Sequence, residues 1–545
     1  MENQGGILVY LCVKPQKTGT NQTQSDMKKL YFLALAALLL AACKTETKVP
    51  VLTIEGGQVQ GVTTDIKGVV AYKGIPYAAP PIGELRWKEP QPVVPWDGVL
   101  KADRFGHPGY QAVHYPGGYF TEWGYGEEAQ CSEDCLYLNV WTKAAGKPGE
   151  KLPVAYWIHG GGYREGWGSE PEFDGEEFAD HGVVLVSINY RLGVFGFLAH
   201  PELAAESPHG VSGNYGVLDM IQGLKWVKEN ITQFGGDPDN VMIFGQSAGG
   251  GAVRTLVESP LARGLFHKAV IMSAGGMGGM GGGRRPAAAP AAAPARPGAP
   301  AARPAMNFGP QTLESIQNAN KEILDWAGLT DLQKMRAAGT ETIYALSTIY
   351  NGANRQEVPA MGGLFGGRAL TGAPIVDGYV SLKSFDEAAM DGSLADVPYM
   401  MGFTKDDMGN MTEGIATFAL NREEKGGKCY AYQFARPLPD DGSQKVYVLK
   451  GAFHSSDLWY VFKSLKHCWR PWTQGDWDLA EKEITAWSNF AKTGDPGIGW
   501  TPYTKENPKF MVFKLDEADK EASEMGDPVA GERFSWPPQP PKEEK

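Results

Sequence analysis

Ser247 lies in the stretch FGQSAGGG (residues 244–251), directly after a short apolar run. A nucleophilic serine needs a sharp turn between a strand and a helix, with small residues two positions before it and two after it. Gly245 and Gly249 meet that requirement, and Ala248–Val257 is expected to form the helix. The alternative is a polar residue in a glycine loop, since the chain contains 70 glycines. The order of strand, turn and helix favours the nucleophile.

A second run of small residues, HGGGY at 159–163, follows the apolar stretch Leu152–Ile158. Acyl transfer needs hydrogen-bond donors aimed at the oxygen that becomes negative, and glycines let backbone N–H groups turn inward. We expect the N–H groups of Gly161, Gly162 and Ala248 to form this oxyanion hole. Because HGGG occurs together with the serine turn, a chance glycine turn is the weaker interpretation.

The elements around these residues alternate between strand-like and helical patterns. Leu152–Ile158 and Val183–Ile188 are apolar and β-branched, which is typical of buried parallel strands. Tyr215–Phe234 has apolar residues at helical spacing and stops at a Gly-Gly pair, and Val241–Phe244 predicts the next strand. This order predicts an α/β fold with a central, mostly parallel, twisted sheet flanked by helices.

Six stretches spread over the chain share one resemblance. They are GIPYAAPPIGELRW (74–87), SEDCLYLNVW (132–141), HGGGY (159–163), NYRLGVFGFL (189–198), FGGDPDNVMIFGQSAGG (234–250) and NFAKTGDP (489–496). Together they resemble the type B carboxylesterases, a family that includes bacterial esterases and cholinesterases. The resemblance covers most of residues 50–515. It implies the α/β-hydrolase fold and the hydrolysis of carboxylic esters through an acyl-enzyme on Ser247.

The same resemblance implies a catalytic histidine late in the chain, after the acid. His454, in GAFHSSDLWYVF (451–462), matches the family's catalytic-histidine segment. It would take the proton of Ser247 and later protonate the leaving alcohol. Its main rivals are His467, expected to be a surface or packing residue, and His159, expected to hold the oxyanion loop.

The acid is expected in MGFTKDDMG (401–409), which resembles the family's stretch ending in Asp-Glu-Gly. The register puts Asp407 where that glutamate usually lies, although an aspartate is one methylene shorter. The rival is Asp406, which would otherwise cap a turn, whereas Asp377 is expected to be structural. Ser273, in VIMSAGG, resembles a buried family serine that lies near the acid, so we expect it to support the acid indirectly.

The N-terminal region predicts export. Met27-Lys28-Lys29, followed by the apolar run Leu30–Ala42, is typical of a secretory signal and is too short to span a bilayer. It ends in Leu40-Ala41-Ala42-Cys43, which resembles a bacterial lipobox whose cysteine becomes the lipidated first residue. The alternative is a plain signal peptide or a core helix. We expect an exported bacterial lipoprotein, anchored through Cys43 at the outer membrane or cell surface, with the periplasmic face as the other site.

These signals divide the chain into segments. A low-complexity insertion at 275–306, which carries four arginines and no acid, is expected to be disordered. We favour a surface segment over a basic binding arm for it. The expected segments are an upstream extension 1–26, a lipoprotein signal peptide 27–43, a tether 44–50, a catalytic domain 51–535 and a Pro-rich tail 536–545.

Four cysteines remain beyond the signal, in an expected oxidising setting. In the family, the counterpart of Cys135 usually pairs with an upstream cysteine in the stretch that here reads Phe105–Gln111, which contains none. Cys131 is then the nearest replacement, although a bridge to Cys135 would close only a tight loop. Cys429 with Cys468 is the remaining possible disulfide.

Composition and charge limit the classes of molecule that the chain is expected to bind. The chain is 42% hydrophobic and 21% charged, which is typical of a globular protein. Without residues 1–43 it has 47 basic and 61 acidic residues, a net charge of −14, which argues against a nucleic-acid partner. No metal-ligand cluster, phosphate loop or nicotinamide fingerprint occurs, so the expected hydrolysis needs no cofactor or metal. The expected substrate is a small-molecule or glycan-linked ester.

The sequence leaves the ester itself open between small aryl esters, feruloyl or acetyl groups on plant polysaccharide, and short acylglycerols. Tyr110–Tyr125 and Trp167 could line the substrate site, but packing is at least an equal explanation. Two other functions are possible. An adhesion protein of this family would lack the serine or its partners, whereas Ser247 and His454 are both present. A serine peptidase would use the same order of Ser, acid and His, but the type B stretches favour esters.

Overall fold

The computed structural model describes residues 49–111, 118–123, 130–278, 312–348, 370, 373–443 and 448–532. These residues belong to one unit, which begins at Val49. The predicted upstream extension, signal peptide, Cys43, most of the tether, the insertion beyond Gly278 and the Pro-rich tail lie outside the described residues. Among the helices of the described ranges, none combines the length and the apolar character needed to cross a membrane.

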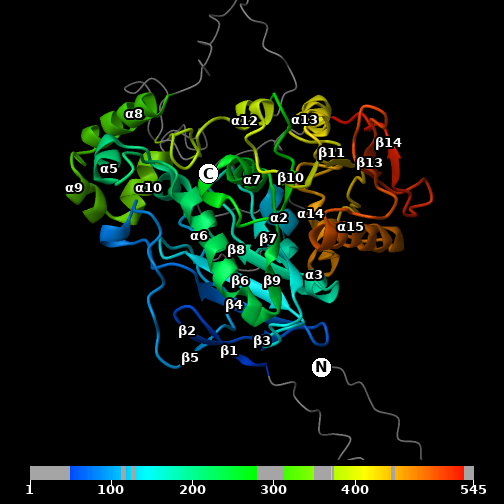
Figure 1. The fold of residues 1–545 in the computed structure, drawn as a ribbon, viewed down its shortest axis with the longest axis horizontal. Helices are drawn as coiled ribbons and strands as arrows, with labels where there is room; N and C mark the ends of the chain where they lie inside the picture. The colour runs from blue at the N-terminus through cyan, green and yellow to red at the C-terminus, as the bar shows by residue number, and fades with distance from the viewer. Residues whose placement is uncertain are drawn as a thin grey trace, which may run out of the picture. The chain divides into compact units, whose positions relative to one another are not determined.

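A large mixed sheet forms the centre of the fold. Its strand order is β14-β13-β12-β11-β10-β9-β7-β8-β6-β4-β3, and Figure 1 shows the blue strands β3 and β4 and the red strand β14 at its opposite ends. Pairing is parallel from β8 through β13 and antiparallel at both edges. The strands are β3 Val62–Thr63, β4 Val70–Pro76, β6 Tyr137–Thr142, β7 Leu152–Ile158, β8 Val184–Ile188, β9 Gly236–Gln246, β10 Lys268–Met272, β11 Tyr399–Thr404, β12 Cys429–Phe434, β13 Phe510–Phe513 and β14 Glu524–Gly526.

Residues along each strand alternate between two buried apolar clusters, one on each face of the sheet. On β7, Val154, Tyr156 and Ile158 belong to the first cluster, whereas Ala155 and Trp157 belong to the second. Helices α6 and α7 contribute to the first cluster, and α3, α14 and α15 contribute to the second. The sheet is therefore covered by helices on both faces, as the sequence predicted.

The helices and a small second sheet complete the described unit (Figure 1). The small sheet pairs β1 Val51–Ile54, β2 Gly57–Gln60 and β5 Val99–Lys101. The α-helices are α2 Gly118–Trp123, α3 Glu176–Asp180, α4 Gly193–Phe197, α5 Pro201–Glu206, α6 Tyr215–Asn230, α7 Ala248–Glu258, α8 Leu313–Trp326, α9 Leu332–Ala337, α10 Thr340–Thr348, α12 Phe385–Asp391, α13 Thr412–Glu424, α14 Leu458–Val461 and α15 Gln474–Thr493. Short 3₁₀ turns are η1 Gly83–Leu85, η2 Pro171–Phe173, η3 Ile231–Phe234, η4 Pro260–Ala262 and η5 Leu465–His467.

Candidate active site

Ser247 forms the turn between β9 and α7. Its backbone has φ 56° and ψ −121°, a conformation that costs energy for a residue with a Cβ and therefore needs support from its surroundings. Its N–H donates to Met272 O at 2.9 Å on β10, and its carbonyl accepts from Gly251 N in the first turn of α7. The sheet and the helix together hold the serine in this strained position.

The glycines around Ser247 are needed because the backbones approach closely. A Cβ on Gly249 would lie 2.0 Å from Ile158 O, at the end of β7. A Cβ on Gly245 would lie 2.5 Å from Gly249 and 2.8 Å from the same carbonyl. Contacts this short exclude any side chain without backbone movement, so the spacing read from the sequence corresponds to a real steric requirement.

The HGGGY segment passes directly beside the serine. A Cβ on Gly160 would lie 3.2 Å from Ser247 Cβ. Gly161 and Gly162 have φ values of 95° and 62°, which glycine adopts readily. The Gly161 carbonyl accepts hydrogen bonds from the N–H groups of Arg164 and Glu165, each at 3.0 Å, so the loop closes on itself. The two expected oxyanion glycines therefore lie in a tight turn at the serine.

His159 fixes the start of this loop. Its ring stacks on Tyr190 with 4.4 Å between centroids, and Tyr190 Oη donates to His159 O at 3.0 Å. Burial lowers the pKa of His159 to about 4, so its ring is neutral near neutral pH. The structure keeps His159 within the loop and its packing, in agreement with the role expected for it.

Asp407 and His454 lie in direct contact. Asp407 Oδ1 accepts from His454 Nδ1 at 2.6 Å, and both side chains are buried. Asp407 also accepts from Met408 N at 2.7 Å, and its Oδ2 accepts from the N–H and the hydroxyl of Thr404, each at 3.1 Å. Burial works against ionisation, but the charge of His454 and hydrogen bonds from His454 and Met408 N–H outweigh it and hold the pKa of Asp407 below its usual value.

Asp406 has a different task. Its N–H donates to Ala452 O, and its Oδ2 accepts from Ala452 N, both at 2.9 Å. Its Oδ1 accepts from Glu532 N at 3.0 Å. Asp406 therefore fixes the backbone that leads into His454, while Asp407 contacts the imidazole.

Ser273 is fully buried at the end of β10, with a φ of 50°. Its N–H donates to Gly402 O at 2.8 Å, on the neighbouring strand β11. Its hydroxyl is buried without a hydrogen-bond partner among the described residues, so its support of the acid stays a prediction.

Gln246 is a neighbour of the imidazole that sequence reasoning missed. Its amide Nε2 donates toward His454 Nε2 at 3.3 Å, while Nδ1 of the same ring faces Asp407. Among the hydrogen bonds of the described residues, none joins the Ser247 hydroxyl to His454. The sequence signal for this contact was the position of Gln246 directly before Ser247, because a residue next to the nucleophile lies close to its general base.

Tyr119, on α2, is a second residue whose contact the sequence did not predict. Its hydroxyl donates to His454 O at 2.6 Å, and its ring stacks on Trp123. The same short helix carries Glu122, whose buried carboxylate accepts from Arg470 Nε at 2.8 Å and from Trp459 Nε1 at 3.2 Å. This buried ion pair ties α2 to the segment that follows His454.

The other candidates fall outside the site. Asp377 Oδ1 accepts three backbone N–H groups, at 379, 380 and 381, and its Oδ2 accepts from Asn214, so it organises a turn as expected. His467 is exposed, and its Nε2 lies 3.7 Å from Asp174 Oδ2. Trp167 is buried, with 8% of its surface exposed, which favours packing.

The cysteines contradict the disulfide prediction. Cys131, Cys135, Cys429 and Cys468 are all thiols in the structure. Cys429 packs in the first apolar cluster, whereas Cys468 packs against the second, so the sheet separates the two. Cys135 is buried in the first cluster, while Cys131 is partly exposed. Burial raises the pKa of Cys429 and of Cys468 to about 12, which further disfavours the reactive thiolate.

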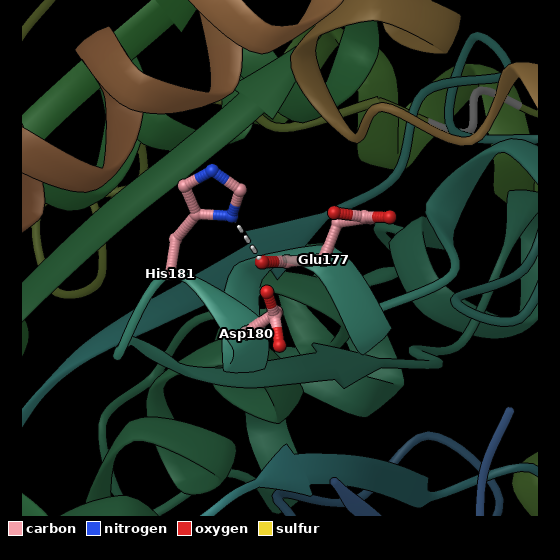
Figure 2. A group of neighbouring side chains, drawn as sticks. All are labelled: Glu177, Asp180 and His181. Carbon is pink, nitrogen blue, oxygen red and sulfur yellow. Dashed lines mark hydrogen bonds between the residues drawn. The ribbon is translucent and has the colours of Figure 1, made fainter. Parts of the chain in front are cut away.

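Glu177, Asp180 and His181 form a group of possible metal-binding side chains at α3 (Figure 2). His181 Nδ1 donates a hydrogen bond to the backbone O of Glu177 at 2.7 Å, and this contact is dashed in Figure 2. Lys463 pairs with Glu177 at 3.1 Å, and Lys143 pairs with Asp180. Because these carboxylates already have cationic partners, ion pairing accounts for the group.

Known proteins share this architecture and sequence. The Carboxylesterase family matches residues 48–291 and 410–528. The chain is 32% identical to fumonisin B1 esterase of Sphingopyxis macrogoltabida, over 88% of this chain and 78% of that protein. It is 31% identical to para-nitrobenzyl esterase of Bacillus subtilis, over 89% and 97%.

Solved structures agree with the sequence relatives. A PNB esterase structure matches with a TM-score of 0.64 and 27% identity, over 87% of this chain and 97% of that one. A carboxylesterase of Geobacillus stearothermophilus matches with a TM-score of 0.65 and 29% identity over the same shares. The fold is therefore the α/β-hydrolase fold of these esterases, and the chain belongs to the carboxylesterase family and is a carboxylic ester hydrolase.

Proposed function

We propose that the chain hydrolyses small carboxylic esters in two steps, through an acyl-enzyme formed on Ser247. His454 is the general base and acid, and Asp407 orients its ring and stabilises the positive charge that the ring acquires. The observation that carries the proposal is the 2.6 Å hydrogen bond from His454 Nδ1 to Asp407 Oδ1. It fixes the tautomer that leaves Nε2 as a proton acceptor, next to the residue that precedes Ser247.

In the first step, the Gln246 amide leaves His454 Nε2, which then accepts the proton of the Ser247 hydroxyl. The serine oxygen forms a bond to the ester carbonyl carbon, and the carbonyl oxygen becomes negative. The N–H groups of Gly161, Gly162 and Ala248 stabilise this oxyanion. When the ester C–O bond breaks, His454 gives its proton to the leaving alcohol.

In the second step, water attacks the acyl carbon and His454 takes a proton from it. The acyl carbon–serine bond then breaks, the acid leaves, and the proton returns to the Ser247 oxygen. His159 supports both steps indirectly, since its stacking on Tyr190 holds the loop that presents the donors.

The relatives named above act on a para-nitrobenzyl ester and on fumonisin B1, as their names state. For this chain we propose a small aryl, alkyl or glycan-linked ester. Tyr119 and Trp123 of α2 stack on each other with 5.6 Å between centroids, and Trp123 also packs on Trp459. These contacts favour a structural role for the part of the aromatic stretch that the structure describes.

Purified variants and a series of p-nitrophenyl esters test the mechanism. Ser247→Ala and His454→Ala should each lower kcat by roughly 10³-fold or more, since these groups act as a unit. Asp407→Asn should be severe, whereas its neighbour Asp406→Asn should cause a smaller loss. A folded Ser247→Ala enzyme with near-wild-type turnover would falsify the mechanism, and a peptide substrate in parallel excludes or reveals peptidase activity.

A further inference from the structure

A cavity of about 230 Å³ lies along α7, outside the residues of the candidate triad. One wall is the α7 face that carries Gly251 and Arg254. Opposite walls come from Ile375 and Val376 and from Phe385 at the start of α12. The lining also contains polar residues, among them Thr255, Ser381 and Ser384. A space of this size, with a partly apolar wall and the partly buried cation Arg254, is suited to a short chain that ends in an anionic group.

The cavity begins one helical turn beyond Ser247. Gly251 lines it, and Gly251 N donates to Ser247 O at 2.9 Å. Arg254 is two turns along, or about 10 Å by the rise of a helix. Long side chains on a helix lean toward its N-terminus, and Arg254 Nη1 accordingly donates to Ala274 O at 2.7 Å. Ala274 lies two residues after Met272, whose carbonyl accepts from Ser247 N. The guanidinium of Arg254 therefore extends back toward the serine.

The positive charge of Arg254 is only weakly balanced by nearby carboxylates. Its side chain is 17% exposed, and its ion pair to Asp386 Oδ1 measures 3.4 Å. The other oxygen of Asp386 accepts from Gly278 N at 2.8 Å. Burial lowers the pKa of Arg254, and Asp386 offsets only part of this effect. The guanidinium also lies 4.4 Å from the centroid of the Phe385 ring, which faces the cavity.

The other charged residues of the lining are Lys383 and Glu258. Lys383 pairs with Asp391 at 2.6 Å on the exposed side. Glu258 Oε1 accepts the N–H groups of Leu382 and Lys383 at 2.6 and 2.9 Å, whereas its Oε2 is buried without a partner among the described residues. Burial raises the pKa of Glu258, which favours its neutral form beside a ligand carboxylate. Arg254 is therefore the lining cation with the longer carboxylate contact, and a ligand carboxylate would improve its compensation.

We propose that this cavity binds a carboxylate on the acid part of the ester substrate, with Arg254 as its partner. The inference rests on the proposed function, because it lets the acyl chain run from Ser247 along α7. It makes monoesters of short dicarboxylic acids the preferred class over neutral esters of the same length.

The test compares mono-p-nitrophenyl esters of succinic, glutaric and adipic acids with neutral esters of equal chain length. The selectivity, measured as the ratio of kcat/KM for charged over neutral ester, should favour the charged ester for at least one length. In Arg254→Gln this ratio should fall about tenfold or more, while Arg254→Lys should retain part of it. The control Arg263→Gln, which lies outside the cavity lining, should keep the wild-type ratio.

A ratio that stays unchanged in a folded Arg254→Gln enzyme would overturn the proposal. Binding of free adipate to the Ser247→Ala protein, by calorimetry, gives a readout that does not depend on catalysis. Adipate should bind this protein, lose affinity in the added Arg254→Gln variant, and compete with neutral esters in the active enzyme. Binding that depends on Arg254 but does not compete would overturn the assignment to the substrate. If the triad mechanism fails, the calorimetry still decides whether Arg254 binds the anion.

Discussion

The reach of a single side chain depends on its neighbour in sequence. Asp407 is shorter than the glutamate expected at its position, yet it contacts His454 at 2.6 Å. Asp406 explains the contact. Its two hydrogen bonds with Ala452 and its parallel β-bridge with Phe453 hold the backbone before His454 against the end of β11. Two adjacent aspartates thus divide the work, one positioning the backbone and the other contacting the ring.

Asp457 predicts a measurable pH effect on stability. Burial, followed by the charge of Asp407, raises its pKa to about 7, while His454 and the hydroxyl of Tyr432 oppose the shift. Since its unfolded pKa is about 3.9, the folded state resists ionisation and loses stability as pH rises through the interval up to about 7. Asp457→Asn removes this loss. The stability of the variant relative to wild type should rise between pH 5 and pH 8, on the order of 2 kcal/mol.

Urea unfolding at four pH values between 5 and 8 measures this difference. Ser456→Ala is the matched control, because Ser456 is the adjacent buried residue and does not titrate. Its stability difference from wild type should stay constant with pH. A constant difference for Asp457→Asn as well would contradict the raised pKa.

At the scale of elements, the turn at Ser247 is set by the distance between β7 and α7. Gly249→Ala would put a methyl group 2.0 Å from Ile158 O, and the pairing of Ile158 with Gly245 leaves the strands little freedom to separate. We expect a loss of unfolding free energy of about 1–3 kcal/mol and a marked fall in kcat, because Ser247 is displaced. Thermal melting and ester hydrolysis measure the two effects.

Gly149→Ala is the control for this change. A Cβ on Gly149 meets no atom within 4 Å, so both Tm and kcat should stay near wild type. Wild-type Tm and kcat in Gly249→Ala would mean that close packing does not hold the serine turn.

Local spacing explains which elements could be predicted from the sequence. The strand expected at Leu152–Ile158 is β7 itself, and the expected helix Ala248–Val257 extends by one residue in α7. The helical pattern of Tyr215–Phe234 continues from α6 into a 3₁₀ turn, because the periodicity of apolar residues does not distinguish the two. Each of these features depends on residues close together in the chain.

Contacts between distant residues could not be predicted in the same way. The contact between Gln246 and His454 joins positions 208 apart, and that between Tyr119 and His454 joins positions 335 apart. Such pairs depend on the order of the strands, which periodicity does not specify. The same reason accounts for the wrong disulfide prediction, since Cys429 and Cys468 lie on opposite faces of the sheet.

At the scale of the whole molecule, the thiols test this separation of the two faces. Alkylation of unreduced, denatured protein should modify all four of Cys131, Cys135, Cys429 and Cys468, because the structure joins none of them in a disulfide. In the native protein, Cys135 and Cys429 should react slowly, since both are buried and their thiol pKa values are raised. Peptide mass spectrometry reads out each site. A disulfide-linked peptide would show that the core arrangement differs.

The last prediction concerns where the enzyme is held. Cys43 follows Leu40-Ala41-Ala42 at the end of a short apolar run, outside the described residues, and we expect it to carry diacylglycerol and an acylated amino group. Each buried CH₂ adds about 0.8 kcal/mol, so several chains anchor far more firmly than one. The segment 44–50 precedes β1, and a tether of this length reaches at most about 25 Å. The active site would therefore work close to a bacterial membrane surface.

Fractionation of cells that express wild type, Cys43→Ser and Cys12→Ser tests the anchor. Wild type should be recovered with membranes and released by detergent, whereas Cys43→Ser should lose the lipid and appear in the soluble fraction. Cys12→Ser is the matched control, because Cys12 lies upstream of the predicted signal and should behave as wild type. Esterase activity per folded molecule should be equal in all three, since the substitutions lie outside the catalytic unit. Equal amounts of wild type and Cys43→Ser in the soluble fraction would mean that Cys43 is no anchor and that residues 27–43 act at most as an ordinary signal peptide.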